Sequence, residues 1–131
     1  MYTIALDTNF LMCCVKQKID FIQELERICN FTYNIIIPES VLEELKNIAD
    51  KGTGKEKEIA NITLDLIKNL ILKNKIKIKK ITERNADSSL LKLDRKNYII
   101  ATLDKELRKK LKNAKVLGIK QFKYLHFPDF I

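Results

Sequence analysis

Near its N-terminus the chain reads Tyr2-Thr3-Ile4-Ala5-Leu6-Asp7-Thr8-Asn9. A short run of strand-forming residues stops abruptly at an aspartate, which predicts a buried strand over residues 2–6 followed by a polar turn. The pattern returns late in the chain, where an apolar run over residues 98–103 also stops at an aspartate, Asp104. This second aspartate stands where an N-cap would begin a helix over residues 105–113. Two predicted strands that end in aspartate are the first indication of both a fold and a shared site.

Strands and helices alternate between these two runs. We expect further strands over residues 33–37, 76–79 and 116–119. Apolar residues at helical spacing predict helices over residues 19–29, 40–49, 56–72 and 86–96. This order favours an α/β sandwich built around a mainly parallel sheet. The length of 131 residues suits one domain, with a core of about 1–119 and an aromatic C-terminal tail at 120–131.

Three local features refine this expectation. Ser40-Val41-Leu42-Glu43 has the spacing of a capping box, in which Ser40 and Glu43 exchange hydrogen bonds at the start of a helix. The alternation of Ile and Lys over residues 76–79 indicates a half-exposed strand at a sheet edge. The predicted 56–72 helix carries two adjacent apolar rows. The first row contains Ile59, Ile62, Leu66 and Leu70, and the second contains Ile67 and Ile71.

The formal net charge is +8, from 25 basic and 17 acidic side chains. It is distributed unevenly, because residues 1–50 carry four basic and eight acidic side chains, whereas residues 51–131 carry 21 and nine. Such asymmetry favours an anionic partner, nucleic acid above all. A compositional origin stays open, because the chain has 21 lysines and 19 isoleucines, a bias that a heat-adapted source imposes on any protein.

Several classes of protein are excluded. No apolar run approaches the ~20 residues that a membrane helix needs, and Asp7 comes before any signal-peptide core could form. We therefore expect a soluble, cytoplasmic protein with no membrane partner. Cys13, Cys14 and Cys29 have neither the number nor the spacing of a disulfide framework or a zinc site. They are predicted to be small buried apolar groups.

Acidic residues recur where the predicted parallel strands would end. Ligands gather at the carboxyl ends of such strands, so Asp7 and Asp104 would share one edge. Each has a structural alternative, an Asx-turn for Asp7 and a helix cap for Asp104. Glu44 and Asp87 begin helices at the same edge, and Glu44 is preferred over Glu43 because the capping box already uses Glu43. The sequence therefore predicts a cluster of four carboxylates.

Four carboxylates at one place raise one another's pKa unless a cation neutralises them. Oxygen ligands without a nearby cysteine or histidine favour Mg²⁺ or Mn²⁺ over zinc. Such an ion suits phosphodiester hydrolysis, because it lowers the pKa of a bound water and stabilises the transition state. The single histidine cannot by itself supply both the acid and the base of a metal-free ribonuclease. Ala49 stands where the first glycine of a P-loop would be, which excludes that motif.

The acidic segments resemble the four motifs of the PIN-domain nucleases, in the same order over residues 1 to about 119. They are Leu6-Asp7-Thr8-Asn9, Pro38-Glu39-Ser40-Val41-Leu42-Glu43-Glu44-Leu45, Ala86-Asp87-Ser88-Ser89-Leu90-Leu91 and Ala101-Thr102-Leu103-Asp104-Lys105-Glu106-Leu107. The resemblance implies a Rossmann-like three-layer sandwich and a Mg²⁺- or Mn²⁺-dependent endonuclease that cleaves single-stranded RNA. By position, it makes Asp7, Glu44, Asp87 and Asp104 the catalytic metal ligands. It makes Asn9 a polar neighbour that orients Asp7 or a bound water.

The resemblance leaves the biological role open. The loop Gly52-Thr53-Gly54-Lys55-Glu56 is similar to that of an archaeal subgroup related to factors that process small-subunit ribosomal RNA, whereas VapC-type toxins are more distant. Ribosomal RNA processing, RNA surveillance and toxin action are all consistent with the sequence, with an antitoxin or a ribosomal assembly factor as partner and single-stranded or structured RNA as substrate. Ser88 and Leu103 stand where many members have aspartate and asparagine. The main alternative is therefore a catalytically weak RNA-binding or ribosome-assembly module; phosphotransfer of the haloacid-dehalogenase kind would want an aspartate at Asn9.

The basic and aromatic side chains of the second half also have two interpretations. The predicted helix after Asp104 has a cationic face that would bind RNA beside the carboxylates, or would be an ordinary solvated face. Its residues are Lys105, Arg108, Lys109 and Lys112. Aromatic residues of the tail are expected to pack in the core or in a homodimer contact rather than to stack on bases. They are Phe122, Tyr124, Phe127 and Phe130.

Overall fold

The protein forms a six-stranded sheet, seen in a computed structural model that describes residues 1–81, 83 and 85–128. The strand order is β3-β2-β1-β4-β5-β6, in which the first five strands are parallel and β6 is antiparallel to β5. The bounds are β1 Tyr2–Leu6, β2 Tyr33–Pro38, β3 Lys77–Lys79, β4 Tyr98–Ala101, β5 Lys115–Lys120 and β6 Tyr124–His126. The order of the parallel strands is that of a doubly wound fold. The predicted mainly parallel α/β architecture is therefore confirmed, with β3 at an edge as expected.

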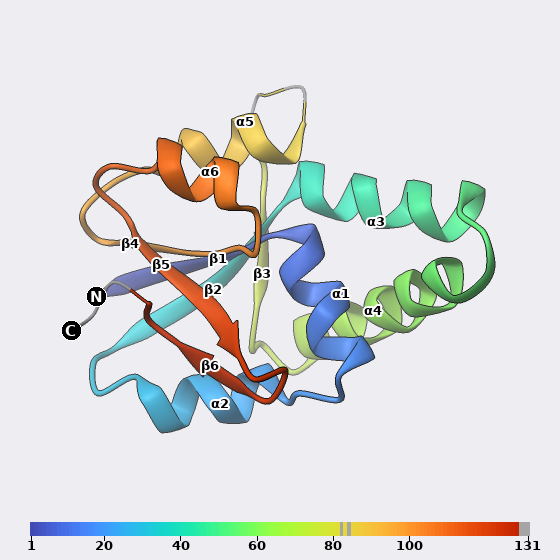
Figure 1. Ribbon diagram of the computed structural model, residues 1–131, viewed down its shortest axis with the longest axis horizontal. Helices are drawn as coiled ribbons and strands as arrows, with labels where there is room; N and C mark the ends of the chain where they lie inside the picture. The colour runs from blue at the N-terminus through green and yellow to red at the C-terminus, as the bar shows by residue number, and fades with distance from the viewer. Residues whose placement is uncertain (82, 84, 129–131) are drawn as a thin grey trace.

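Helices cover both faces of the sheet (Figure 1). The helices α1 (Thr8–Lys16), α2 (Phe21–Ile28) and α4 (Gly54–Leu72) pack on the face with the larger core, and α5 (Ala86–Leu91) and α6 (Lys105–Lys110) pack on the other. α3 (Glu39–Lys51) runs beside α4, and the pair extends beyond the sheet. Among the described residues no helix is long and apolar enough to cross a membrane. The three-layer arrangement is confirmed.

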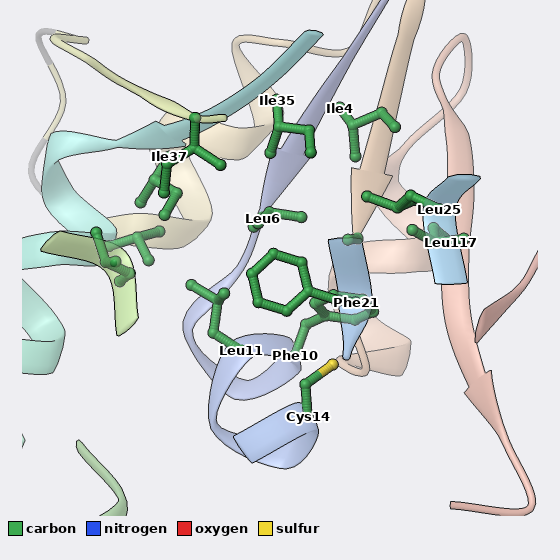
Figure 2. Packing of buried hydrophobic residues seen from close by; sticks show 14 of the residues in the cluster. Ile4, Leu6, Phe10, Leu11, Cys14, Phe21, Leu25, Ile35, Ile37 and Leu117 are labelled. Carbon is green, nitrogen blue, oxygen red and sulfur yellow. The ribbon is translucent and has the colours of Figure 1, made fainter. Parts of the chain in front are cut away.

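Side chains of the central strands alternate between two cores. Ile4 and Leu6 of β1 lie with Phe10 of α1 in the larger core, as Figure 2 shows. Ala5 lies in the smaller core with Leu90 of α5. The same alternation recurs in β2 and β4. Because both faces of these strands are buried, their sequences are almost continuously apolar, and this is the signal that made the strands predictable.

Residues 7–9 do not form the predicted polar turn. α1 begins directly at Thr8, and Asp7 is its N-cap, with the carboxylate accepting a hydrogen bond from Thr8 N at 2.7 Å. The helix buries Phe10, Leu11 and Cys14. Its residues 12–15 include two cysteines and a valine, which have modest helix propensity. Packing against the sheet overrides that propensity, so the sequence pattern alone missed the helix.

The start of α3 also differs from the prediction. The helix begins at Glu39, directly after Pro38, and no side chain caps it. Ser40 lies inside the first turn, is buried, and donates a hydrogen bond to Ser89 Oγ of α5 at 2.7 Å. The predicted capping box of Ser40 and Glu43 is therefore wrong. The Ser40 hydroxyl joins two helices that are distant in sequence instead of capping its own helix.

The buried face of α4 is rotated from the predicted one. Ile62 and Ile71, which the periodicity assigns to the apolar rows, are 48% and 37% exposed. Thr63 is fully buried instead, and its hydroxyl donates to Ile59 O at 2.7 Å. α4 packs against both α1 and α3, which selects this face among several apolar ones. The buried residues are Ile59, Ala60, Thr63, Ile67 and Leu70.

Both α5 and α6 end earlier than predicted, at Leu91 and Lys110 instead of residues 96 and 113. The Asp94 carboxylate explains this, because it accepts hydrogen bonds from three backbone N–H groups after α6, each at 2.8 Å. Those N–H groups belong to Lys112, Asn113 and Ala114. Burial works to raise the pKa of Asp94, but these hydrogen bonds hold it below its usual value. The segments that follow the two helices are thereby fixed to each other.

The C-terminal part contributes an unpredicted strand, β6, which pairs with β5. Phe127 packs against the larger core, as expected of the aromatic residues, whereas Phe122 and Tyr124 are 68% and 44% exposed. Phe130 lies outside the described residues. The cysteine prediction holds fully for Cys14 alone. Cys14 is buried, while Cys13 and Cys29 are only half-buried.

We predict that Asp94→Asn lowers the free energy of unfolding by about 2 kcal/mol, because the charge-assisted hydrogen bonds weaken. Thermal unfolding followed by circular dichroism should show a fall in Tm of roughly 5–10 °C at pH 7. The depressed pKa stabilises the fold above the unfolded value of 3.8 and ceases to do so as the pH falls through the folded value, so the difference should shrink in acid. Asp50→Asn, the same change on the exposed end of α3, is the control. Equal Tm values for the two variants would contradict this role of Asp94.

Candidate active site

The candidate site lies where the strand order reverses. β1 and β4 are neighbours in the middle of the sheet, and their chains leave in opposite directions along it. Asp7 follows β1 directly, and its N–H donates to Ala101 O, the last residue of β4, at 2.9 Å. Asp104 follows β4 after two residues. In open parallel sheets this reversal is the place where ligands bind.

Thr102 connects the two aspartates. Its hydroxyl donates a hydrogen bond to Asp7 Oδ2 at 2.7 Å and accepts one from Asp104 N at 3.1 Å. The side chain of Thr102 is 3% exposed and that of Asp7 is 4% exposed, so both groups are held in a buried place. Sequence reasoning missed Thr102, although its position two residues before Asp104 within the fourth motif was a usable signal.

Asp104 has the capping role that was its structural alternative, and it lies at the site as well. Its Oδ1 accepts hydrogen bonds from Glu106 N at 2.9 Å and Leu107 N at 3.3 Å, which begins α6. The same carboxyl interacts with Asp7 strongly enough to raise the pKa of Asp7. The two interpretations of this aspartate are therefore compatible.

Glu44 reaches the site from α3. Although the residue is exposed overall, partial burial of its carboxyl raises its pKa, and the charges of Asp7 and Asp87 raise it further. The adjacent Glu43 is exposed and is not involved in the predicted capping box. The preference for Glu44 over Glu43 thus survives, although the reason for it was wrong.

Asp87 completes the group. It lies in the first turn of α5, which Asn85 caps by accepting a hydrogen bond from Ser88 N at 2.9 Å. The buried hydrogen bond between Ser40 and Ser89 holds this turn against α3. Burial raises the pKa of Asp7 first of all, hydrogen bonds from Thr102 and Thr8 oppose this, and the charges of Asp87 and Asp104 add to the rise. The structure therefore places Glu44, Asp87 and Asp104 within electrostatic range of Asp7.

The other predicted site residues are placed less closely. Asn9 is exposed in the first turn of α1, and the hydrogen bonds to the Asp7 carboxylate come from Thr8 and Thr102. Lys105, Arg108 and Lys109 are exposed on α6, and Lys109 lies 3.7 Å from Glu106. Lys112 does not share their helical face, because α6 ends at Lys110 and the Lys112 N–H is held by Asp94.

The donor set at this place fits a hard divalent cation. Among the described residues, the interactions that set the pKa of Asp7 and of Glu44 include no cationic side chain. Thr8 Oγ1 is buried beside them without a hydrogen bond of good geometry in the described part of the chain, and it acts on the Glu44 carboxyl only as a weak donor. Uncompensated carboxylates and an unsatisfied hydroxyl oxygen are ligands of the kind that Mg²⁺ or Mn²⁺ takes.

The carboxylates do not yet form a closed ligand sphere. In the ranges that the structure describes, no three Asp, Glu, His or Cys side chains are close enough to hold one ion together. Asp7 is fixed by two hydrogen bonds, whereas Glu44 and Asp87 are exposed. Ion binding therefore requires rotation of the exposed side chains toward Asp7.

We predict that Glu44→Gln raises the stability of the metal-free protein at pH 7 by up to about 1 kcal/mol, or a few degrees in Tm, because it removes like-charge repulsion. The folded pKa of Glu44 is raised, so the proton stabilises the folded state below the unfolded value of 4.5, and that stabilisation is lost as the pH rises through the folded value. The advantage of Glu44→Gln should therefore vanish below pH 4.5. Glu43→Gln is the matched control in calorimetry with EDTA. A lower Tm for Glu44→Gln than for that control would rule out repulsion at this site.

Comparisons with known proteins identify the family of the chain and support its fold. Residues 4–121 match the family described as PIN like domain. The chain is 38% identical over 130 residues to Ribonuclease VapC4 of Methanocaldococcus jannaschii, with 95% of each chain covered. The PIN domain endonuclease Utp24 shares the fold with a TM-score of 0.78 and 22% identity, over 99% of this chain and 93% of that one. The structure of VapBC2 from Rickettsia felis bound to a DNA fragment is also similar, with a TM-score of 0.59 and 18% identity. The match covers 88% of this chain and 98% of that one. This chain belongs to the PIN domain family.

Proposed function

We propose that the protein is a divalent-metal-dependent endoribonuclease that hydrolyses single-stranded RNA. One observation carries the proposal: at the reversal of the strand order the Asp7 carboxyl interacts with Glu44, Asp87 and Asp104, each from a separate element, and no cationic side chain among the described residues compensates Asp7 or Glu44. The relative with 38% identity carries the name ribonuclease, which supports this reaction over other phosphoester chemistry.

Each group of residues at the site has a separate role in the proposed hydrolysis. Mg²⁺ or Mn²⁺ bound at Asp7, Glu44, Asp87 and Asp104 would lower the pKa of an attacking water and neutralise charge on the phosphate. Thr102 holds Asp7 and the backbone of Asp104 in fixed positions. Asn9, exposed on the first turn of α1, would orient a water at the rim of the site.

The substrate is proposed to be RNA because the carboxylate cluster lies in a protein of net charge +8. Lys105, Arg108 and Lys109 on α6 follow Asp104 directly and would contact the phosphate backbone. Lys112 would contribute through its side chain from the loop beyond the helix.

Two biological roles fit this chemistry. The likeness to Ribonuclease VapC4 favours a toxin, whose partner would be an antitoxin. A small antitoxin gene next to the gene of this protein would distinguish this role from ribosomal RNA processing. A role in ribosomal RNA processing with an assembly partner has weaker support, because the likeness to Utp24 concerns the fold.

A catalytically weak RNA-binding or ribosome-assembly module is the second candidate. It is favoured by the open arrangement of the acids, since no three lie close enough to hold one ion within the described ranges. Ser88 also stands where many family members have aspartate. Leu103, which is 38% exposed beside Asp104, has no polar side-chain group, whereas many members have asparagine there.

The main prediction concerns cleavage of single-stranded RNA with Mn²⁺. Asp7→Asn and Asp104→Asn should each lower the rate by at least about 10–100-fold, the loss that removal of even an outer partner of a metal ligand causes. Asparagine is as good an N-cap as aspartate, so both variants should stay folded. Asp20→Asn makes the same change at the N-cap of α2 and should cleave like the wild type.

Cleavage that persists in both substituted proteins, or in excess EDTA, would overturn the metal–carboxylate mechanism. A wild-type protein that binds RNA without cutting it under any divalent ion would establish the binding module instead.

A second prediction isolates the contribution of Thr102. Thr102→Val keeps the shape and removes the hydroxyl that fixes Asp7 and Asp104, so we expect weaker Mn²⁺ affinity by roughly 10–100-fold. Thr102→Ser retains the hydroxyl and should stay within a few-fold of the wild type. Mn²⁺ titrations of the cleavage rate measure this, and a Val variant with unchanged metal dependence would refute the positioning role.

A further inference from the structure

An exposed aromatic ring lies at the turn between β5 and β6. Phe122 is 68% exposed and has a φ of 54°, and the preceding Gln121 has a φ of 55°. The turn is closed by a hydrogen bond from Lys123 N to Lys120 O at 3.1 Å. Left-handed backbone in two-residue hairpin turns is normally supplied by Asn-Gly, and it is strained for a bulky residue. Phe122 is therefore unfavourable in two ways, through its exposed apolar surface and through its backbone.

The ring forms one wall of a cavity of about 470 Å³. The other residues that line the cavity include the apolar side chains of Met12 and Cys13 of α1 and of Ile59 of α4. Lys16 and Lys55 lie at the cavity with one acid, Glu56. Two further lysines, at positions 120 and 123, flank the ring in the turn and are exposed. The cavity is thus an apolar slot with an excess of positive charge around it.

The slot lies near the same edge of the sheet as the carboxylates, the edge at which the parallel strands end. Leu6, Ala101 and Leu117 are level with one another across β1, β4 and β5. Asp7 follows β1 directly and Asp104 follows β4 after two residues, whereas β5 continues three residues beyond Leu117 before it turns. α1 connects the two places, because Asp7 caps it and Met12 lies five residues along it, about 7.5 Å on the helix axis.

We propose that Phe122 stacks on a base of the single-stranded RNA whose scissile phosphate lies at the carboxylates, while Lys16 and Lys55 hold the neighbouring phosphates. The inference rests on the proposed function, because it assigns a second contact to the same RNA strand. An aromatic ring beside basic side chains is how sequence-tolerant binding of single strands is built.

Charge selects RNA over a second copy of the chain as the occupant. In a symmetric dimer built on this slot, both copies would bring their slot lysines into one interface, with Glu56 as the single acid that each slot contributes. A polyanion with apolar bases matches both features, since the bases enter the slot and the phosphates meet the lysines.

The test measures affinity in EDTA for a short fluorescein-labelled single-stranded RNA of mixed sequence, by fluorescence anisotropy at several salt concentrations. Phe122→Gly should weaken binding roughly tenfold, within the range for removal of one base–aromatic stack, with an unchanged salt slope. Phe122→Trp should bind like the wild type. Tyr124→Ala, which removes an exposed ring of the same hairpin outside the slot, is the matched control and should have no effect.

Two further measurements separate the base from the phosphate. Lys16→Gln with Lys55→Gln should flatten the salt slope by about 0.7 for each phosphate that the lysines no longer neutralise. A labelled abasic chain should bind the wild type and Phe122→Gly equally. Because glycine relieves the left-handed backbone, Phe122→Gly should keep or raise the Tm while its RNA affinity falls.

Three results would overturn the inference. Equal RNA affinity of Phe122→Gly and the wild type, whether or not the Tm falls, would leave the ring without this role while the proposed function stands. A wild-type dimer in sedimentation analysis that Phe122→Gly dissociates would make the slot an interface between copies. A wild-type protein that neither binds nor cuts RNA would overturn both proposals.

Discussion

The hydrogen bond that Thr102 donates to Asp7 is the contact on which the candidate site depends. Asp7 is a nearly buried acid in the middle of the sheet, where an ionised carboxylate without donors would be costly. The parallel pairing of β1 with β4 provides the donor, because Leu6 lies opposite Ala101 and Thr102 therefore comes level with Asp7. The same hydroxyl accepts from Asp104 N, so one side chain sets the positions of two acids. The register of β1 against β4 thereby determines the relative positions of Asp7 and Asp104.

The remaining acids are positioned by neutral contacts rather than by one another. Burial is the main cause of the raised pKa values of Asp7 and Glu44, and repulsion between the carboxyl groups adds to the rise, so the acids cannot hold the site together. The hydrogen bond between Ser40 and Ser89 joins α3 to α5, the two helices that carry Glu44 and Asp87. Asp94 fixes the segments that follow α5 and α6. Hydrogen bonds at some distance from the acids therefore hold them near one another despite their repulsion.

The sequence could predict the parallel sheet because strands buried on both faces leave continuous apolar runs. It could also indicate that these acids lie near one edge of the sheet, because two follow strands and two lie on helices that begin there; their role as metal ligands stays a proposal. It could not predict α1, whose residues have modest helix propensity, or the buried face of α4, which carries more than one apolar row. Thr102 and Ser40 were missed for a different reason. Their partners lie 95 and 49 residues away, and local periodicity carries no signal for such a contact.

The N-termini of three helices help the fold to accommodate these acids. Asp7 and Asp104 are the N-caps of α1 and α6, and Asp87 lies in the first turn of α5. A negative charge at a helix N-terminus gains about 0.3–1 kcal/mol, which offsets part of the repulsion. Capping by Asp104 uses Oδ1 for both hydrogen bonds, and a carboxylate has acceptor capacity on two oxygens. Asp104, which caps α6 through one oxygen, thus keeps its other oxygen for a cation. For an aspartate at the end of a strand, helix capping therefore stabilises the carboxylate that would also bind the cation.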